Sequence, residues 1–135
     1  MKILIFAALL ISFSFSFSST IDEYLNSLKQ EALKEDPNFK NFDAKRGEEI
    51  FTSKHIGKKG KEISCTSCHG TDLTKSHENF FTGKTIEPLS PKTNQKRLTD
   101  INEIEKWLKR NFNDVYNKEG TAIQKGDVIT YIINK

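Results

Sequence analysis

Methionine, cysteine and tryptophan are all scarce in this sequence. Met1 is the one methionine, Trp107 is the one tryptophan, and the two cysteines, Cys65 and Cys68, are separated by only two residues. A bond between cysteines this close would close almost no loop, so the chain cannot be a disulfide-stabilised scaffold. With 135 residues, it also has no room for two large catalytic domains.

Long apolar runs are confined to the N-terminus. Lys2 is followed by apolar residues from Ile3 to Ile11, and then phenylalanine and serine alternate as far as Ser18. This order is typical of a secretory signal peptide cleaved near Ser18. The apolar stretch is shorter than the ~20 residues of a membrane span, and nothing after Phe17 is apolar enough for one. We therefore expect residues 1–18 to be a signal peptide, and the mature protein to be exported to the periplasm without membrane insertion.

Apolar residues are too few in the rest of the chain for an ordinary core. They make up roughly 30% of residues 19–135, which is below the share in typical globular domains. A domain of this size and polarity needs something further to pack around, such as a metal, a partner or a large apolar cofactor.

Apolar spacing and capping residues predict four helices. The first, of about 14 residues, begins at a capping box formed by Thr20 and Glu23 and ends before Asp36 and Pro37. The second follows an N-cap at Asp43, with Ile50 and Phe51 on its apolar face and with Gly47 allowing close approach of another backbone. The third is predicted from about Asp100 to Asn111 and the last from Ala122 to Ile133. Residues 19–42 are thus expected to be an N-terminal helix and linker, and residues 43–135 the main domain.

Two connecting segments are predicted to be irregular. The basic stretch from Ser53 to Ser64 contains lysines and glycines and is expected to be a solvated loop. Pro88 and Pro91 exclude helix and favour an extended, stiff segment.

Cys65, Cys68 and His69 form a Cys-x-x-Cys-His pattern, which is the spacing of covalent haem attachment. Two thiols at this spacing can add to the two vinyl groups of haem, and the next imidazole then lies beneath the iron. His69 is the expected proximal ligand through Nε2. One covalently attached haem c would also supply the apolar group that the core lacks.

Two other uses of the cysteines are weighed against haem attachment. A thioredoxin-like redox pair requires a βαβ context, whereas the flanking sequence predicts loop and helix. A zinc site formed by Cys65, Cys68 and His77 has suitable ligand types but lacks a second ligand pair at a familiar spacing.

The second axial ligand cannot be methionine, because Met1 is removed with the signal peptide. His55, His77, a lysine, an amide side chain or an open position remain. The histidines fall on no periodic apolar face, and the simplest interpretation of both is exposure to solvent. Asn111 shares a helical face with Ile104 and Leu108, and an amide buried on such a face needs a polar partner, such as the iron. A role as the C-cap of the third helix explains this asparagine equally well.

The sequence resembles the sphaeroides haem protein (SHP) family of c-type cytochromes from about Asp43 to Ile133. The resemblance rests on the haem motif and on segments around it, of which the Trp-Leu-x-Arg-Asn pattern is the most specific. These segments are Arg46–Phe51, Thr82–Lys84, Pro88–Pro91 and Glu105–Asn111.

The resemblance implies a small all-α fold of the class I cytochrome c type. It also implies that Asn111 is the distal metal ligand, bound to ferric haem and released on reduction, so that the reduced iron takes up oxygen or nitric oxide. Two further cofactor-binding residues are implied: Pro88, whose carbonyl would accept from Nδ1 of His69, and Trp107, which would pack on the haem or its propionate edge. Dihaem or membrane cytochromes are the implied redox partners.

The sequence departs from the family at one pair of positions. The family pattern has a second pair of cysteines where this chain has Phe112 and Gly120. A disulfide there would stiffen the loop after Asn111, so its absence bears on the rigidity of the distal pocket.

Three functions follow from these residues. The first is periplasmic electron transfer with redox-gated binding of a diatomic ligand; the others are a plain bis-histidine electron carrier and a small reductase or oxidase of oxygen or nitric oxide. No catalytic acid–base pair is recognisable, and no aromatic-basic pattern points to nucleic acid. Four lysines before the haem motif suggest a weak docking surface for acidic partners: Lys54, Lys58, Lys59 and Lys61.

Overall fold

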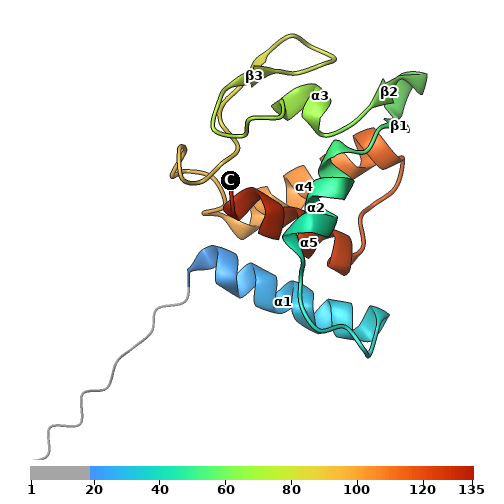
Figure 1. Ribbon diagram of the computed structural model, residues 1–135, viewed down its shortest axis with the longest axis vertical. Helices are drawn as coiled ribbons and strands as arrows, with labels where there is room; N and C mark the ends of the chain where they lie inside the picture. The colour runs from blue at the N-terminus through green and yellow to red at the C-terminus, as the bar shows by residue number, and fades with distance from the viewer. Residues whose placement is uncertain (1–18) are drawn as a thin grey trace, which may run out of the picture.

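The computed structural model describes residues 19–135, which form an all-α domain, as predicted (Figure 1). The predicted signal peptide lies outside the described residues. Four of the helices are long, and the strands are only two residues each. The helices are α1 (Thr20–Glu35), α2 (Ala44–Thr52), α3 (Thr66–His69), α4 (Ile101–Tyr116) and α5 (Ala122–Ile133); the antiparallel pairs are β1 (His55–Ile56) with β2 (Glu62–Ile63) and β3 (His77–Glu78) with β4 (Thr85–Ile86), and the 3-10 turn η1 is Lys58–Gly60.

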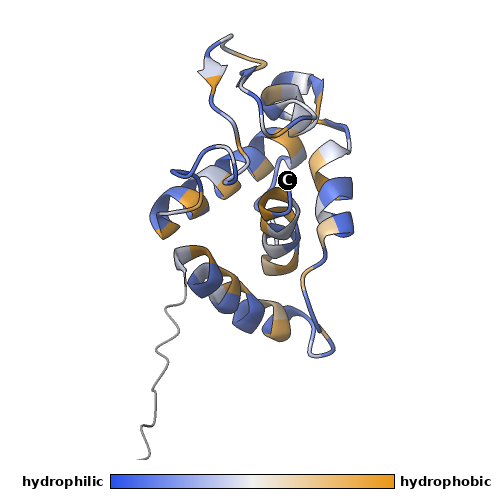
Figure 2. Cartoon of the chain, turned by 60° about the vertical axis from the view of Figure 1, so that its left-hand side comes forward, coloured by the Kyte–Doolittle hydropathy of each residue, from blue (hydrophilic) through white to orange (hydrophobic). Residues whose placement is uncertain are grey.

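Helix α5 is the centre of the domain. It packs against both α1 and α2, and it carries mostly hydrophobic residues, whereas the outer helices alternate hydrophilic and hydrophobic ones (Figure 2). The remaining helix, α3, lies with the strands on the side of the domain away from α1 (Figure 1). Within residues 19–135, no helix is long and apolar enough to cross a membrane.

The crossing of α2 and α5 depends on a glycine and on an ion pair between a half-exposed arginine and a buried aspartate. A Cβ at Gly47 would lie 2.0 Å from the carbonyl oxygen of Asp127, so the two backbones are in direct contact there. Beside it, Nε of Arg46 donates to Oδ2 of the buried Asp127 at 2.8 Å and Nη2 donates to Oδ1 at 2.9 Å. Phe51 and Tyr131 stack one helical turn further on, with 5.4 Å between ring centroids. The close approach predicted at Gly47 is therefore confirmed.

Most helix starts follow the predicted caps. Asp43 and Asp100 accept hydrogen bonds from the backbone three residues on. Thr121, which was not predicted as a cap, does so in a capping box before α5. The first helix differs by one residue, because Ser19 is its N-cap and pairs with Asp22, rather than Thr20 with Glu23.

Helix α4 is longer than predicted. It continues past Asn111 to Tyr116 and ends at Asn117, which has the left-handed conformation (φ 54°) of a C-cap. The reason is that Phe112 and Val115 continue its buried face. The interpretation of Asn111 as a C-cap is therefore wrong.

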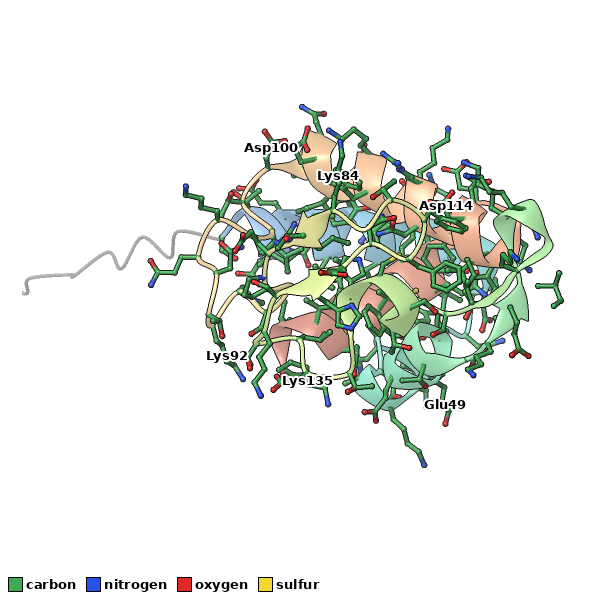
Figure 3. All side chains as sticks on the ribbon, turned by 90° about the horizontal axis from the view of Figure 1, so that it is seen from above. Glu49, Lys84, Lys92, Asp100, Asp114 and Lys135 are labelled. Carbon is green, nitrogen blue, oxygen red and sulfur yellow. The ribbon has the colours of Figure 1, made fainter. Side chains whose placement is uncertain are left out.

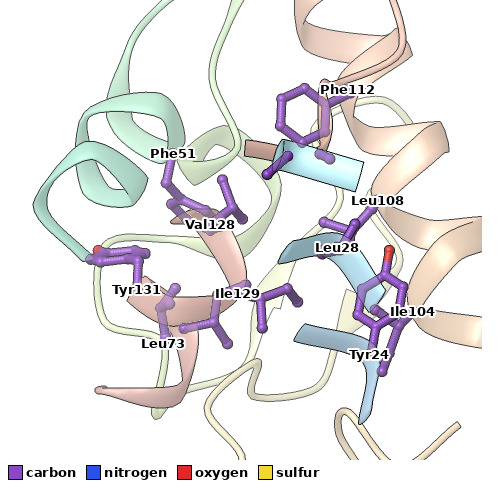
Figure 4. Close-up of a cluster of buried hydrophobic side chains, with 13 residues drawn as sticks. Tyr24, Leu28, Phe51, Leu73, Ile104, Leu108, Phe112, Val128, Ile129 and Tyr131 are labelled. Carbon is purple, nitrogen blue, oxygen red and sulfur yellow. The ribbon is translucent and has the colours of Figure 1, made fainter. Parts of the chain in front are cut away.

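The core is a single hydrophobic cluster that joins the four long helices and Leu73 (Figure 4). The basic stretch predicted as loop is more ordered than expected, since β1 and β2 pair within it and bury Ile63. Nδ2 of Asn117 donates to the carbonyl of Ile56 at 2.9 Å and ties this hairpin to the end of α4.

Candidate haem-binding site

The Cys-x-x-Cys-His pattern forms one isolated turn of helix. Cys65 is the N-cap of α3, and its carbonyl accepts from the backbone N–H of Cys68 at 3.2 Å and of His69 at 3.0 Å. Gly70 ends the turn with φ 71°, a conformation that favours glycine. Both thiols and the imidazole are thereby held on a single turn, at its first, fourth and fifth residues, and this turn lies over the centre of the domain, between α2 and α4 (Figure 3).

The two cysteines are free thiols. Burial, together with the neighbouring Cys68, raises the pKa of the Cys65 thiol to about 12. A redox-active pair needs the opposite, a thiol whose pKa is lowered. No group of three or more His, Cys, Asp or Glu side chains that could hold a metal ion is found within residues 19–135. The geometry therefore favours neither the thioredoxin-like use nor the zinc site.

The imidazole of His69 is partly buried and neutral. Burial, with the nearby charges of Arg97 and His77, lowers its pKa to about 4, so its nitrogen lone pair is free at neutral pH. Nδ1 is buried and has no hydrogen-bond partner among the described residues. The hydrogen bond predicted from Nδ1 to the carbonyl of Pro88 is not formed, because that carbonyl accepts from Nε of Arg97 at 3.0 Å and from Nδ2 of Asn94 at 3.2 Å.

Asn111 lies at the edge of the buried face of α4. It is partly buried, and it follows the buried Ile104 and Leu108 by seven and three residues and precedes the buried Val115 by four. Its side-chain amide makes no hydrogen bond to another residue of the described chain. An amide at the rim of an apolar face without a protein partner is suited to bind something else.

Phe112 and Gly120, which stand where the family pattern has its second pair of cysteines, are in direct contact. A Cβ at Gly120 would lie 2.8 Å from the ring of the buried Phe112, so this ring packs on the bare backbone of Gly120. Phe112 also contacts Tyr116, with 5.5 Å between ring centroids. The packing of Phe112 on Gly120 thus connects the helix that carries Asn111 to the loop that follows this helix.

Trp107 is exposed on α4, and its packing on the haem or its propionate edge stays a prediction. Its side chain is 44% exposed, and Nε1 donates to Oε2 of Glu103 at 3.1 Å. The charged ends of Lys106 and Arg110 each lie 5.3 Å from its ring.

The two other histidines serve in packing. The ring of His55 stacks on Tyr116 with 4.2 Å between centroids, and its Nε2 is buried without a partner among residues 19–135. His77 is exposed and lies against Gly70, where an added Cβ would be 2.8 Å from the imidazole.

Sequence reasoning missed two groups beside the motif. The backbone N–H of Phe80, a residue that is 50% exposed, donates to Sγ of Cys68 at 3.4 Å. Arg97 projects toward Pro88 and affects the charge state of His69. No periodic pattern marks either residue, and only the fold of the connecting loops brings them to the motif.

Known proteins match this chain in sequence. Residues 37–132 match the family model described as a domain of unknown function (DUF1924). Cytochrome c-type protein SHP of Cereibacter sphaeroides is 41% identical over 90 residues, which cover 67% of this chain and 69% of that protein. Cytochrome c'' of Methylophilus methylotrophus is 34% identical over 89 residues, which cover 66% of this chain and 62% of that protein.

Solved structures match the fold over most of the chain. Oxidised cytochrome c'' from Methylophilus methylotrophus has a TM-score of 0.77 and 28% identity, and the match covers 86% of this chain and 94% of that one. Oxidised SHP, an oxygen-binding cytochrome c, has a TM-score of 0.76 and 32% identity, with 88% and 100% covered. A solution structure of the same cytochrome c'', which addresses haem-ligand detachment, has a TM-score of 0.76 and 28% identity, with 85% and 93% covered.

Proposed function

The chain belongs to the SHP family of monohaem c-type cytochromes, and from that premise we propose that it transfers electrons in the periplasm and binds a diatomic ligand when reduced. The ligand is oxygen or nitric oxide. His69 and Asn111 would hold the iron in the oxidised protein, and Asn111 would be released on reduction.

The residues of the α3 turn fit a covalently held haem. Free thiols at Cys65 and Cys68 lie on one helical turn and can form the two thioether bonds. The neutral imidazole of His69 can bind iron through Nε2. Haem bound in this way supplies one-electron chemistry and a second axial position.

The observation that carries the proposal is the unpartnered amide of Asn111 on the inward edge of α4. An amide oxygen is a hard, neutral and weak ligand compared with imidazole or thioether. It therefore holds ferric iron better than ferrous iron, and reduction frees the side chain. Once released, the amide no longer competes with a small neutral ligand for the iron. The redox state of the protein therefore controls whether that ligand can bind.

Two relatives support this assignment from different directions. SHP is an oxygen-binding cytochrome c, and cytochrome c'' is a protein in which a haem ligand detaches. A ligand that leaves and a small molecule that binds are the two halves of the proposed mechanism.

The proposed redox partner is an acidic dihaem or membrane cytochrome that docks near Cys68. Two of the four lysines before the motif are neutralised in part, since Lys54 lies 3.9 Å from Glu62 and Lys58 lies 3.3 Å from Asp114. Lys59 is different: its ammonium group lies 5.3 Å from the ring centroid of Phe81, next to the exposed Phe80. A positive charge beside exposed aromatic rings suits a weak, salt-sensitive complex.

Substitution of Asn111 tests the axial assignment. Asn111→Ala should give a high-spin ferric spectrum with the haem still covalently attached. The matched control is Asn113→Ala on the same helix, whose exposed amide only donates to the carbonyl of Lys109, and it should keep the low-spin spectrum. A low-spin spectrum in Asn111→Ala that becomes high-spin in His77→Ala or His55→Ala would instead establish the bis-histidine carrier.

A further inference from the structure

A cavity of about 410 Å³ lies between α1 and α4, and no residue of the haem motif lines it. Tyr24, Leu28 and Glu31 of α1 form one wall, and Glu105 belongs to the wall that α4 forms. The two helices contact each other in the folded domain. The proposed electron transfer and ligand binding make no use of this cavity.

Tyr24 is a buried residue of this cavity whose hydroxyl has no protein partner. The residue is only 3% exposed, and its ring lies beside Ile104 of α4 (Figure 4). Its hydroxyl makes no hydrogen bond to another residue of the described chain. Because a buried tyrosine hydroxyl normally has a hydrogen-bond partner, a ligand in the cavity is a natural partner for it.

Glu31 and Glu105 are the carboxylates of the cavity that have no ion pair. Neither lies within 4 Å of a basic group of residues 19–135, and the lysines of the cavity are paired with other carboxylates. These pairs are Lys106 with Glu103 at 2.5 Å, Lys109 with Glu119 at 3.8 Å and Lys125 with Glu119 at 3.5 Å. Two unpaired negative charges on one cavity repel each other, and a bound cation would relieve that repulsion.

The two carboxylates and the hydroxyl belong to one site. All three side chains line the same cavity. Burial raises the pKa of Tyr24, and the charges of Glu105 and Glu31 raise this pKa further. Since the interaction between charges weakens with distance, this effect agrees with carboxylates that lie near the hydroxyl oxygen. The cavity therefore presents acceptor oxygens from two helices.

We infer that this cavity binds a small molecule through a primary ammonium group. Such a group has three N–H donors, and Glu31, Glu105 and Tyr24 supply three acceptors. The buried Leu28 provides an apolar surface for the alkyl part of the molecule. A metal ion fits less well, because Ca²⁺ takes about six to eight oxygen ligands, and the described part of the chain holds no group of three or more metal-binding side chains.

The test is isothermal titration of the haem-loaded protein with n-butylammonium chloride. Tyr24→Phe, Glu31→Gln and Glu105→Gln should each weaken binding about tenfold, because each removes one acceptor of the charged group. The matched control is Glu23→Gln, which removes the same charge from an exposed position of α1 outside the cavity, and it should change the affinity less than about threefold.

A second probe separates hydrogen bonding from charge alone. Butyltrimethylammonium carries the same charge but has no N–H donor, so the wild type should bind it at least about tenfold more weakly than butylammonium. Equal affinity for the two probes, or no binding of butylammonium, would overturn the inference.

The other contrary results are equally distinct. Equal effects of Glu31→Gln and Glu23→Gln would show that net charge alone attracts the probe, and displacement of butylammonium by the same concentration of Ca²⁺ would show a metal site instead. The comparison of the two probes uses the wild type, so it decides the question even if a variant does not fold. The inference does not depend on the proposed function, because none of the three side chains belongs to the haem motif.

Discussion

Replacement of Gly47 by alanine should destabilise the protein, although alanine is the better helix former. In a helix interior, alanine is favoured over glycine by about 0.5–1 kcal/mol. At Gly47, however, the added carbon would lie 2.0 Å from the carbonyl oxygen of Asp127 and 2.9 Å from Cβ of Tyr131. These atoms belong to the α5 backbone or adjoin it and cannot rotate away, so α2 and α5 must separate.

The expected loss follows from the contacts that separation weakens. Overpacking by itself costs about 1–3 kcal/mol. The pair of the half-exposed Arg46 with the buried Asp127 spans the same crossing, and its weakening adds about 1 kcal/mol at most. With the helix preference subtracted, we expect a net loss of about 2 kcal/mol, which lowers Tm by roughly 8 °C.

Thermal unfolding of the haem-loaded protein, followed by far-UV circular dichroism, measures this loss. The control is Lys45→Ala, an exposed position on the same helix, where the change should stay within about 0.5 kcal/mol. A Gly47→Ala protein with a Tm equal to or above that of the wild type would refute the reasoning.

Three further predictions concern the haem, a buried tyrosine and the docking surface. Replacing Cys65 and Cys68 together with alanine should leave the chain largely unfolded by circular dichroism, because the apolar core is small without haem; a compact protein with native helicity would count against this. Burial raises the pKa of Tyr116 to about 12 from an ordinary value near 10. The contribution of this tyrosine to stability is therefore complete below pH 10 and is lost as the pH rises toward 12. Tyr116→Phe should make the loss of stability between pH 10 and 12 less steep, and an unchanged slope would exclude this tyrosine as a cause. Lys59→Glu should slow electron exchange with an acidic partner at low salt, and the difference should vanish at high salt; an equal effect of Lys34→Glu on α1 would show that only net charge matters.

Local rules predicted the parts of the fold that depend on neighbouring residues. The bounds of α5 were predicted from its apolar spacing. The caps at Asp43 and Asp100 are hydrogen bonds between a side chain and the backbone three residues on, so they too could be predicted from neighbouring residues. The close approach at Gly47 was likewise visible as a glycine inside a helix.

The end of α4 and the hairpin of β1 and β2 required knowledge of distant contacts. Phe112 extends the helix because its ring packs on Gly120, and the hairpin is held by Asn117 at the far end of that helix. Neither contact is encoded by spacing along the chain, so the sequence predicted a shorter helix and an open loop.

The candidate site divides in the same way. The Cys-x-x-Cys-His pattern is local and was recognisable from five residues, whereas Arg97 has partners nine and ten residues earlier in an irregular loop. The packing of Trp107 on the haem or its propionate edge stays a prediction, and in the chain itself the charged ends of Lys106 and Arg110 lie beside its ring.

The most direct test of the central claim is the absorption spectrum of the purified, haem-loaded protein before and after reduction with dithionite. If Asn111 binds ferric iron and leaves on reduction, the oxidised protein is low-spin, and the reduced protein is high-spin and responds to added nitric oxide and carbon monoxide. A reduced protein that stays low-spin and ignores both gases would contradict the release of Asn111.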